Sequence, residues 1–244
     1  ISMIDLTNLN DDCTAADIDT LCATAKATDS RPATAAVCVW PAFVAQSKQA
    51  LSGSTVRVAT VVNFPHGGTD TAAVAIEAIN ALEDGADEID LVFPYQAWMA
   101  GDVETATEQV QAVRAVVESP AQLKVIIETG ELANADLIEA ASLMCIDGGA
   151  DFIKTSTGKV AENATLESAR IMLGAIAKSD GGTGFKPAGG IRTFEEARDH
   201  LALAASIMGE GWATPLTYRF GASSLLASVE AVLTGSDAGP AAGY

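Results

Sequence analysis

The stretch "LKVIIETGELANADLIEAASLMCIDGGADFIKTS", residues 123–156, contains one complete strand–helix–strand pattern. Residues 123–129 and 151–156 are short, largely apolar runs, whereas residues 133–148 between them are alanine-rich with apolar residues at helical spacing. Apolar strands that alternate with helices are typical of a parallel sheet covered on both faces. We therefore predict that residues 123–156 form a β-α-β unit.

The same alternation extends over the whole chain. Strands are predicted at 2–7, 35–40, 55–64, 88–93, 123–129, 151–156, 183–188 and 218–223. Helices are predicted at 14–27, 41–52, 70–85, 102–118, 133–148, 164–178, 194–209 and 223–234. Eight such units predict an α/β fold, a single (β/α)8 TIM barrel. The alternative is an open, doubly wound sheet, which the lack of a G-x-G-x-x-G motif in the first strand–helix turn disfavours.

The barrel is predicted to occupy residues 1–234, because no linker-like segment or repeat interrupts that range. The glycine- and alanine-rich segment 235–244 is predicted to be a flexible tail. The chain begins at Ile1 in a strand-like run without an initiator methionine, which is compatible with residues upstream. In the helix at 70–85 we expect one buried stripe, formed by Val74, Ile76, Ile79 and Leu82.

The composition predicts a soluble globular protein of the cytoplasm. Hydrophobic residues make up 49% of the 244 residues, yet no run of about 18 apolar residues predicts a membrane span. Fourteen basic against 32 acidic residues give a net charge of −18, which argues against nucleic acid or an anionic membrane as partner. Reduced thiols are favoured because no C-x-x-C pair occurs among Cys13, Cys22, Cys38 and Cys145.

No metal ion or other cofactor is predicted. His66 lies in a turn and His200 in a helical stretch, and neither belongs to a His-x-His or HExxH arrangement.

Polar residues at the ends of the strands are the candidates for function, because the active site of a (β/α)8 barrel lies where the strands end and the next loops begin. In chain order they are Asp5 and Thr7, Cys38, Asn63, Asp90, Glu128, Lys154 and Lys186. Cys38 is expected either to be a packed thiol or to line the mouth of the site.

Lys154 and Lys186 are the most informative of these residues. Side chains alternate along a strand, so both are predicted to point into the lumen at the same level of neighbouring strands. Repulsion between two ammonium groups and desolvation both lower a lysine pKa, and a neutral lysine can form a Schiff base with an aldehyde or ketone. The alternative is that each lysine is ion-paired to a carboxylate such as Asp90 or Glu128 and has no chemical role.

Two further charges belong to this interpretation. Asp90 lies inside an apolar strand, so it is expected to contact a lysine, either as a proton shuttle or as a buried counter-ion. Lys124 begins its strand and is expected at the opposite face of the barrel, where a charge serves stability or lies in solvent at the rim.

Glycine-rich loops follow the last three strands: "STGK" (156–159), "AGGIR" (188–192) and "GASS" (221–224). Phosphate sites in these barrels form from such loops and a helix N-terminus, because glycine lets backbone N–H groups approach the anion. The candidates are Gly189, Gly190, Gly221, Ser223 and Ser224, with Lys159 and Arg192 as nearby cations. The alternative for each loop is an ordinary turn, and for Ser223 an ordinary helix N-cap.

With these residues in view, the chain resembles the deoxyribose-phosphate aldolase family over nearly its whole length. The resemblance rests on "IDLTNLND", "NFPHG", "VFPY", "KVIIETGEL", "GADFIKTSTGK", "GFKPAGGIR" and "YRFGASSLL". It implies a (β/α)8 barrel and a metal-free class I aldol reaction. In that reaction 2-deoxy-D-ribose 5-phosphate is reversibly cleaved to D-glyceraldehyde 3-phosphate and acetaldehyde.

The resemblance also implies residue roles. Lys154 would form the Schiff base, Lys186 would depress the pKa of Lys154, and Asp90 would work with Lys186 in proton transfer. Asp5, Thr7 and Tyr244 fall in the substrate pocket, for which Cys38 is a further candidate. Phosphate contacts fall on Gly158, Lys159, Gly189, Gly190, Arg192, Gly221, Ser223 and Ser224.

The implied partners are a phosphorylated deoxysugar, short aldehydes and a second copy of the chain in a homodimer. Ile191, Gln96 and Trp98 depart from the family pattern, which bears on substrate preference and contacts at the rim. Two other functions stay open at this point: a sugar-phosphate isomerase with a carboxylate base, and a non-catalytic phosphosugar-binding protein.

Overall fold

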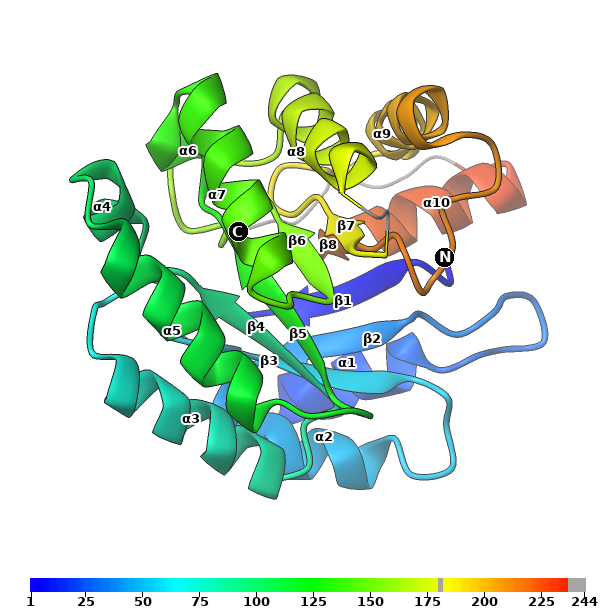
Figure 1. Ribbon diagram of the computed structural model, residues 1–244. Coiled ribbons are helices and arrows are strands. Elements are labelled where there is room, and N and C mark those ends of the chain that lie inside the picture. Colours follow the sequence, from blue (N-terminus) through cyan, green and yellow to red (C-terminus); the bar gives the residue numbers. More distant parts are fainter. Residues whose placement is uncertain (180–181, 237–244) are drawn as a thin grey trace.

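Eight parallel strands surround a lumen in the computed structural model, which describes residues 1–179 and 182–236 (Figure 1). The strands are β1 (Ile4–Asn8), β2 (Ala36–Val39), β3 (Arg57–Val62), β4 (Glu88–Val92), β5 (Gln122–Ile126), β6 (Phe152–Lys154), β7 (Gly184–Lys186) and β8 (Phe220–Ala222). Hydrogen bonds connect them in the order β7-β6-β5-β4-β3-β2-β1-β8.

The two ends of this order meet between β7 and β8. Parallel bridges join Phe185 to Tyr218 and Ala188 to Gly221. In addition, the N–H of Phe185 donates to the carbonyl oxygen of Thr217 at 2.8 Å. These contacts bring the sheet round into a barrel, so the predicted (β/α)8 fold is confirmed and the open-sheet alternative is wrong.

Helices cover the outside of the strands, as Figure 1 shows. The long ones are α1 (Ala15–Ala25), α2 (Val44–Ala50), α3 (Thr71–Glu83), α5 (Val103–Val116), α7 (Ala135–Asp147), α8 (Leu166–Lys178), α9 (Phe194–Met208) and α10 (Leu225–Thr234). All correspond to predicted helices. The short helix η1 (Pro41–Phe43) falls within the predicted helix at 41–52. Two other short helices, α4 (Tyr95–Met99) and α6 (Thr129–Leu132), were not predicted, because one turn is too short to show a periodic pattern.

The buried face of α3 differs from the predicted one. Val74, Ala78 and Ala81 are buried, whereas Ile76 is 57% and Ile79 38% exposed. The buried residues follow the spacing i, i+4, i+7 with two alanines, which lack the large side chains on which the prediction relied. The predicted stripe is therefore wrong at both isoleucines.

At the end of the barrel, α10 is capped by Gly235 in the left-handed conformation with φ 67°. Residues 237–244, which include most of the predicted tail and Tyr244, lie outside the described residues. Within the described part of the chain, no helix is long and apolar enough to cross a membrane. All four cysteines are free thiols.

Candidate active site

The lumen of the barrel has an apolar wall on one side. Leu9 directly after β1 packs there in a small cluster with Ala36 and Cys38 of β2 and with Ala59 and Val61 of β3. Cys38 is fully buried and stands opposite Thr7 in the β1–β2 register. Burial and the nearby Asp90 carboxylate raise the pKa of the Cys38 thiol, so it remains protonated at neutral pH.

The other side of the lumen is charged. Six buried side chains form a closed circle of ion pairs in which acid and base alternate, and we call it the lumen ring. In order, its members are Asp90, Lys186, Asp5, Arg219, Glu88 and Lys124. Three carboxylates thus face three cations, so each buried charge in the lumen ring is compensated by its two neighbours.

The distances in the lumen ring are those of direct ion pairs. Lys186 Nζ lies 2.6 Å from Asp5 Oδ2 and 2.8 Å from Asp90 Oδ2. Lys124 Nζ lies 2.5 Å from Glu88 Oε2 and 2.9 Å from Asp90 Oδ1. Arg219 closes the circle, with Nη1 2.7 Å from Asp5 Oδ1 and Nη2 3.1 Å from Glu88 Oε1.

Strand register explains this arrangement. Glu88 and Asp90 are two residues apart on β4, so both point into the lumen, and Asp90 stands directly opposite Lys124 of β5. Next to them, Lys154 of β6 stands opposite Lys186 of β7. The predicted juxtaposition of Lys154 and Lys186 is confirmed.

Lys154 is attached to the lumen ring from outside. Its Nζ lies 2.8 Å from Asp90 Oδ2, the oxygen that Lys186 also contacts, and its side chain is 4% exposed. The predicted contact between Asp90 and a lysine is therefore present with both residues. Lys154 contacts one carboxylate oxygen, whereas each cation of the lumen ring contacts at least two different carboxylates.

The electrostatics of the lumen ring favour its charged form. Burial opposes ionisation of Asp90, but Lys124, Lys154 and Lys186 hold the pKa of its carboxyl well below the ordinary value. Burial likewise opposes the charge on Lys186, but Asp5 and Asp90 outweigh it and raise the pKa of that ammonium. The expectation that repulsion and burial lower a lysine pKa is therefore wrong for Lys186, because two carboxylates stabilise its charged form.

Lys124 is not at a solvated rim. It is fully buried in the lumen, and its pKa is raised because Asp90 and Glu88 outweigh the effect of burial. The prediction placed it at the opposite face because it comes early in its strand. The tilt of barrel strands brings it level with Asp90 instead.

The remaining strand-end residues surround this centre. Thr7 is buried, and its hydroxyl donates to the carbonyl oxygen of Asp5 at 2.9 Å. Glu128 has a left-handed backbone with φ 55°, accepts a hydrogen bond from the N–H of Thr157, and has its pKa raised by burial. Asn63 instead donates to the carbonyl oxygens of Gly68 and Val92, so it organises loops.

The candidate phosphate loops after β7 and β8 lie side by side, because the Ala188–Gly221 bridge joins them. Gly189 and Gly190 have φ of 78° and 86°, values that favour glycine. A Cβ on Gly221 would lie 2.8 Å from the Cβ of Ala188, so only glycine allows this approach.

The N-cap of α10 is Ser224, not Ser223, which corrects the alternative considered for Ser223. Ser224 makes no side-chain capping bond, and its Oγ is buried without a hydrogen-bond partner. An anion at this helix start would offer the missing partner.

The cations near these loops are partly engaged elsewhere. Lys159 Nζ lies 3.1 Å from Asp11 Oδ1 and 5.9 Å from the centre of the Trp40 ring. Gly158 precedes it with φ 87°. Arg192 is exposed at the start of α9, and its backbone N–H donates to Glu196 Oε2.

Glu88 and Arg219 were not among the predicted site residues. Glu88 lies two positions before Asp90, so the alternation of strand side chains could have found it. Arg219 follows an aromatic residue just before β8, and no local pattern indicates that it points into the lumen.

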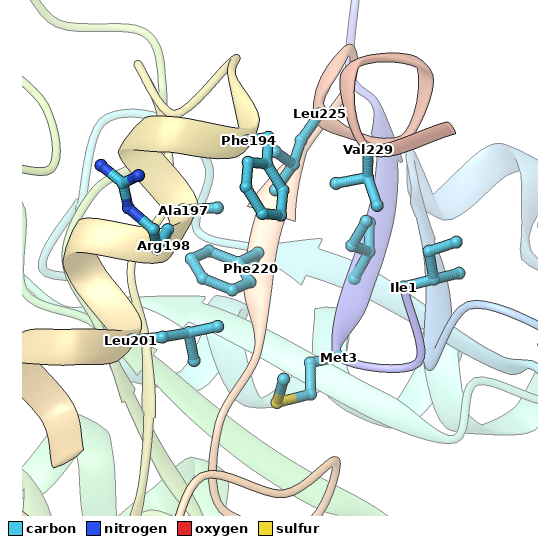
Figure 2. A pocket seen from close by; sticks show the side chains of 10 residues that line it. Ile1, Met3, Phe194, Ala197, Arg198, Leu201, Phe220, Leu225 and Val229 are labelled. Atoms are coloured by element: carbon cyan, nitrogen blue, oxygen red, sulfur yellow. The ribbon is translucent and has the colours of Figure 1, made fainter. Parts of the chain in front are cut away.

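A separate apolar cavity of about 250 Å³ lies outside the strands, between α9 and α10 (Figure 2). Phe194, Leu201, Phe220 and Val229 line it, with Arg198 at one edge. None of the candidate catalytic residues lines this cavity. Among the described residues, no group of three or more His, Cys, Asp or Glu side chains is arranged to hold a metal ion.

Fold and lumen together define a (β/α)8 barrel protein in which Lys154, at the end of β6, is the centre of the candidate site. The family model for "DeoC/LacD family aldolase" matches residues 1–231, and the chain belongs to this family. A deoxyribose-phosphate aldolase of Agrobacterium fabrum (strain C58 / ATCC 33970) is 54% identical over 246 residues, covering 100% of this chain and 94% of the relative.

Solved structures agree with this assignment. The apo form of a proposed deoxyribose-phosphate aldolase from Toxoplasma gondii ME49 has a TM-score of 0.86 at 30% identity, covering 98% of this chain and 95% of that one. The tetrameric deoxyribose phosphate aldolase of Aeropyrum pernix has a TM-score of 0.76 at 25% identity, covering 96% and 90%.

Proposed function

We propose that this protein is a class I aldolase that reversibly cleaves 2-deoxy-D-ribose 5-phosphate to D-glyceraldehyde 3-phosphate and acetaldehyde through a Schiff base on Lys154. The activity is the one named for its relatives. Family membership supports the reaction class, and the surroundings of Lys154 support its role.

The observation that carries the proposal is the position of Lys154 outside a charge-balanced lumen ring. An ammonium on Lys154 adds one positive charge that the lumen ring does not need for its own balance. Loss of that proton leaves three buried acids and three buried bases paired with one another. Lys154 is thus the lysine of the site that can become a neutral nucleophile at the smallest electrostatic cost.

The products contain two and three carbons, so the bond that breaks in the five-carbon sugar is C2–C3. The Lys154 amine adds to the C1 aldehyde of the open-chain sugar and loses water, which gives an iminium ion. Removal of the proton on the C3 hydroxyl lets the C2–C3 bond break, and its electron pair moves to the iminium nitrogen. D-Glyceraldehyde 3-phosphate leaves with carbons 3–5, and protonation and hydrolysis of the enamine release acetaldehyde and the free lysine.

Asp90 and Lys186 are proposed to hold and move the protons, because Asp90 contacts both lysines through one oxygen. Asp5, Thr7 and Cys38 are proposed to line the pocket, as is Tyr244. The substrate phosphate is proposed to bind at Gly158, Lys159, Gly189, Gly190, Arg192, Gly221, Ser223 and Ser224. Unpartnered Ser224 Oγ and the adjacent glycine loops support this assignment.

Borohydride trapping with acetaldehyde tests the proposal. In the presence of a chelator, the wild type should gain one ethyl group, and peptide mass spectrometry should place it on Lys154. An adduct that persists in Lys154→Leu would place the nucleophile elsewhere. Turnover that borohydride and acetaldehyde leave intact would favour an isomerase, which needs no imine.

We also infer a homodimer located in the cytoplasm. The exposed Ile76 and Ile79 on α3 are compatible with a covered surface in a dimer. Sedimentation equilibrium gives the mass directly, and a tetramer, as named for the Aeropyrum pernix relative, is the competing outcome.

A further inference from the structure

Arg219 is an unusual residue to find inside a barrel. Its side chain is 2% exposed, and its guanidinium lies 5.4 Å from the centre of the Phe152 ring. Nη1 and Nη2 contact Asp5 and Glu88, and Nε donates to the carbonyl oxygen of Pro215. An arginine held on all these sides is a fixed positive charge that keeps its proton at any ordinary pH.

Without Arg219 the lumen ring would hold three carboxylates and two cations. Two cations contact the lumen ring from outside, Arg57 at Glu88 and Lys154 at Asp90. Arg57 is charged in any case, so Lys154 is the one whose protonation can respond to the missing charge. A lysine that must compensate a buried carboxylate keeps its proton and is not a nucleophile. The presence of a cation at position 219 therefore bears on the chemistry of a lysine that it does not touch.

We propose that Arg219, by completing the lumen ring, leaves Lys154 free to exist as the uncharged amine, and is thus a positioning residue of the aldolase reaction. The role of the uncharged Lys154 in an aldol reaction rests on the proposed function. The effect of Arg219 on the protonation of Lys154 does not, because that protonation can be measured without turnover.

Other charged and titratable groups also face Lys154. Asp90 on β4 and Lys186 on β7 are in the lumen ring, Glu128 follows β5, and Cys38 lies on β2. At the far side, Arg57 contacts Glu88 at 3.4 Å. All these groups are the same in the variants below, so they do not alter the direction of the expected shifts.

Three variants change the charge of the lumen ring in opposite directions. Arg219→Met removes a positive charge, Glu88→Gln removes a negative one, and the double variant restores the balance. Arg198→Met is the matched control, since it removes an exposed arginine that is paired with the neighbouring Asp199. Reactivity of Lys154 is measured by trace labelling with acetic anhydride across neutral and alkaline pH, with peptide mass spectrometry as readout.

In Arg219→Met, the labelling profile of Lys154 should move to higher pH by roughly one unit, which is a tenfold loss of reactive amine below the midpoint. In Glu88→Gln it should move to lower pH, because the lumen ring then carries surplus positive charge. The double variant should return towards the wild type, and Arg198→Met should not shift. Borohydride trapping with acetaldehyde should follow the same order.

A merely structural Arg219 predicts a different pattern. Loss of activity in Arg219→Met with an unshifted profile, or a shift in the same direction for Arg219→Met and Glu88→Gln, overturns the inference. Circular dichroism shows which variants fold, and if Arg219→Met does not, the downward shift in Glu88→Gln decides alone. A wild type that is labelled normally but never trapped by acetaldehyde refutes the proposed function instead.

Discussion

The mouth and the floor of the lumen each contain a lysine that contacts Asp90, and the two lysines are held very differently. Lys154 stands opposite Ile126 of β5, so Lys124 lies two residues deeper in the lumen, at the level that we call the floor. It contacts Asp90 and Glu88, and its pKa is raised by those carboxylates against the effect of burial. Lys154 at the mouth shares one oxygen of Asp90 with Lys186. The difference teaches that the number of carboxylates around a buried lysine, rather than burial itself, separates a structural cation from a candidate nucleophile.

The largest effect is expected when the mouth lysine is removed. Lys154→Leu deletes the proposed nucleophile, and the rate of glyceraldehyde 3-phosphate release should fall by about 10⁴-fold or more. Stability should change little, because the lumen ring stays balanced without this residue. A coupled assay for the released triose phosphate and a thermal melt check both parts, and turnover within tenfold of the wild type would contradict the role of Lys154.

Removal of the floor lysine should mainly affect stability. Lys124→Met leaves Glu88 and Asp90 close together with one fewer cation, and unpaired buried charges of this kind cost about 3–5 kcal/mol. Urea denaturation gives the free energy of unfolding for this variant and for Lys154→Leu. Equal free energies of unfolding for the two variants would contradict the claim that Lys124 stabilises the fold and Lys154 does not.

Acid should weaken the lumen ring through its carboxylates. The pKa of Asp90 is held well below its ordinary value, and that of Asp5 is also lowered by Lys186 and Arg219 despite burial. The stabilisation is therefore complete above pH ~4, the unfolded pKa of an aspartate, and is lost as pH falls further towards the native value. The free energy of unfolding from urea denaturation should be flat from neutral pH to about 5 and then fall by a few kcal/mol. A steep decline between neutral pH and 5 would point to other groups.

The smallest effect is expected at the solvent edge of the floor. Arg57 contacts Glu88 at 3.4 Å, but its side chain is 29% exposed, so water screens the pair. Arg57→Gln should cost about 1 kcal/mol or less in urea denaturation. A cost similar to that of Lys124→Met would mean that exposure does not separate the two ion pairs.

The sequence was sufficient for the barrel because every strand is an apolar run followed by a periodic helix. It also predicted the lysine pair, because side-chain alternation places Lys154 and Lys186 on the same side at the ends of consecutive strands. What it could not supply was the level of each residue within the lumen. That level depends on the tilt of the strands and on the register between neighbours, and the β4–β5 register places Lys124 opposite Asp90 rather than at the rim.

Contacts across the barrel could also not be predicted from the sequence. Arg219 lies 131 residues after Glu88 in the chain, and nothing near either residue indicates that they meet. The stripe on α3 failed for a simpler reason, since small alanines rather than large isoleucines face the sheet.

The order in which the residues of the lumen ring are synthesised has a consequence for folding. Asp5, Glu88 and Asp90 are all synthesised before Lys186 and Arg219, which lies 214 residues after its partner Asp5. A half-made barrel that closed its lumen would bury carboxylates without enough cations, which is strongly unfavourable. The early strands should therefore stay open to water until Arg219 and β8 have been synthesised, and the nascent chain can complete its barrel only after that point.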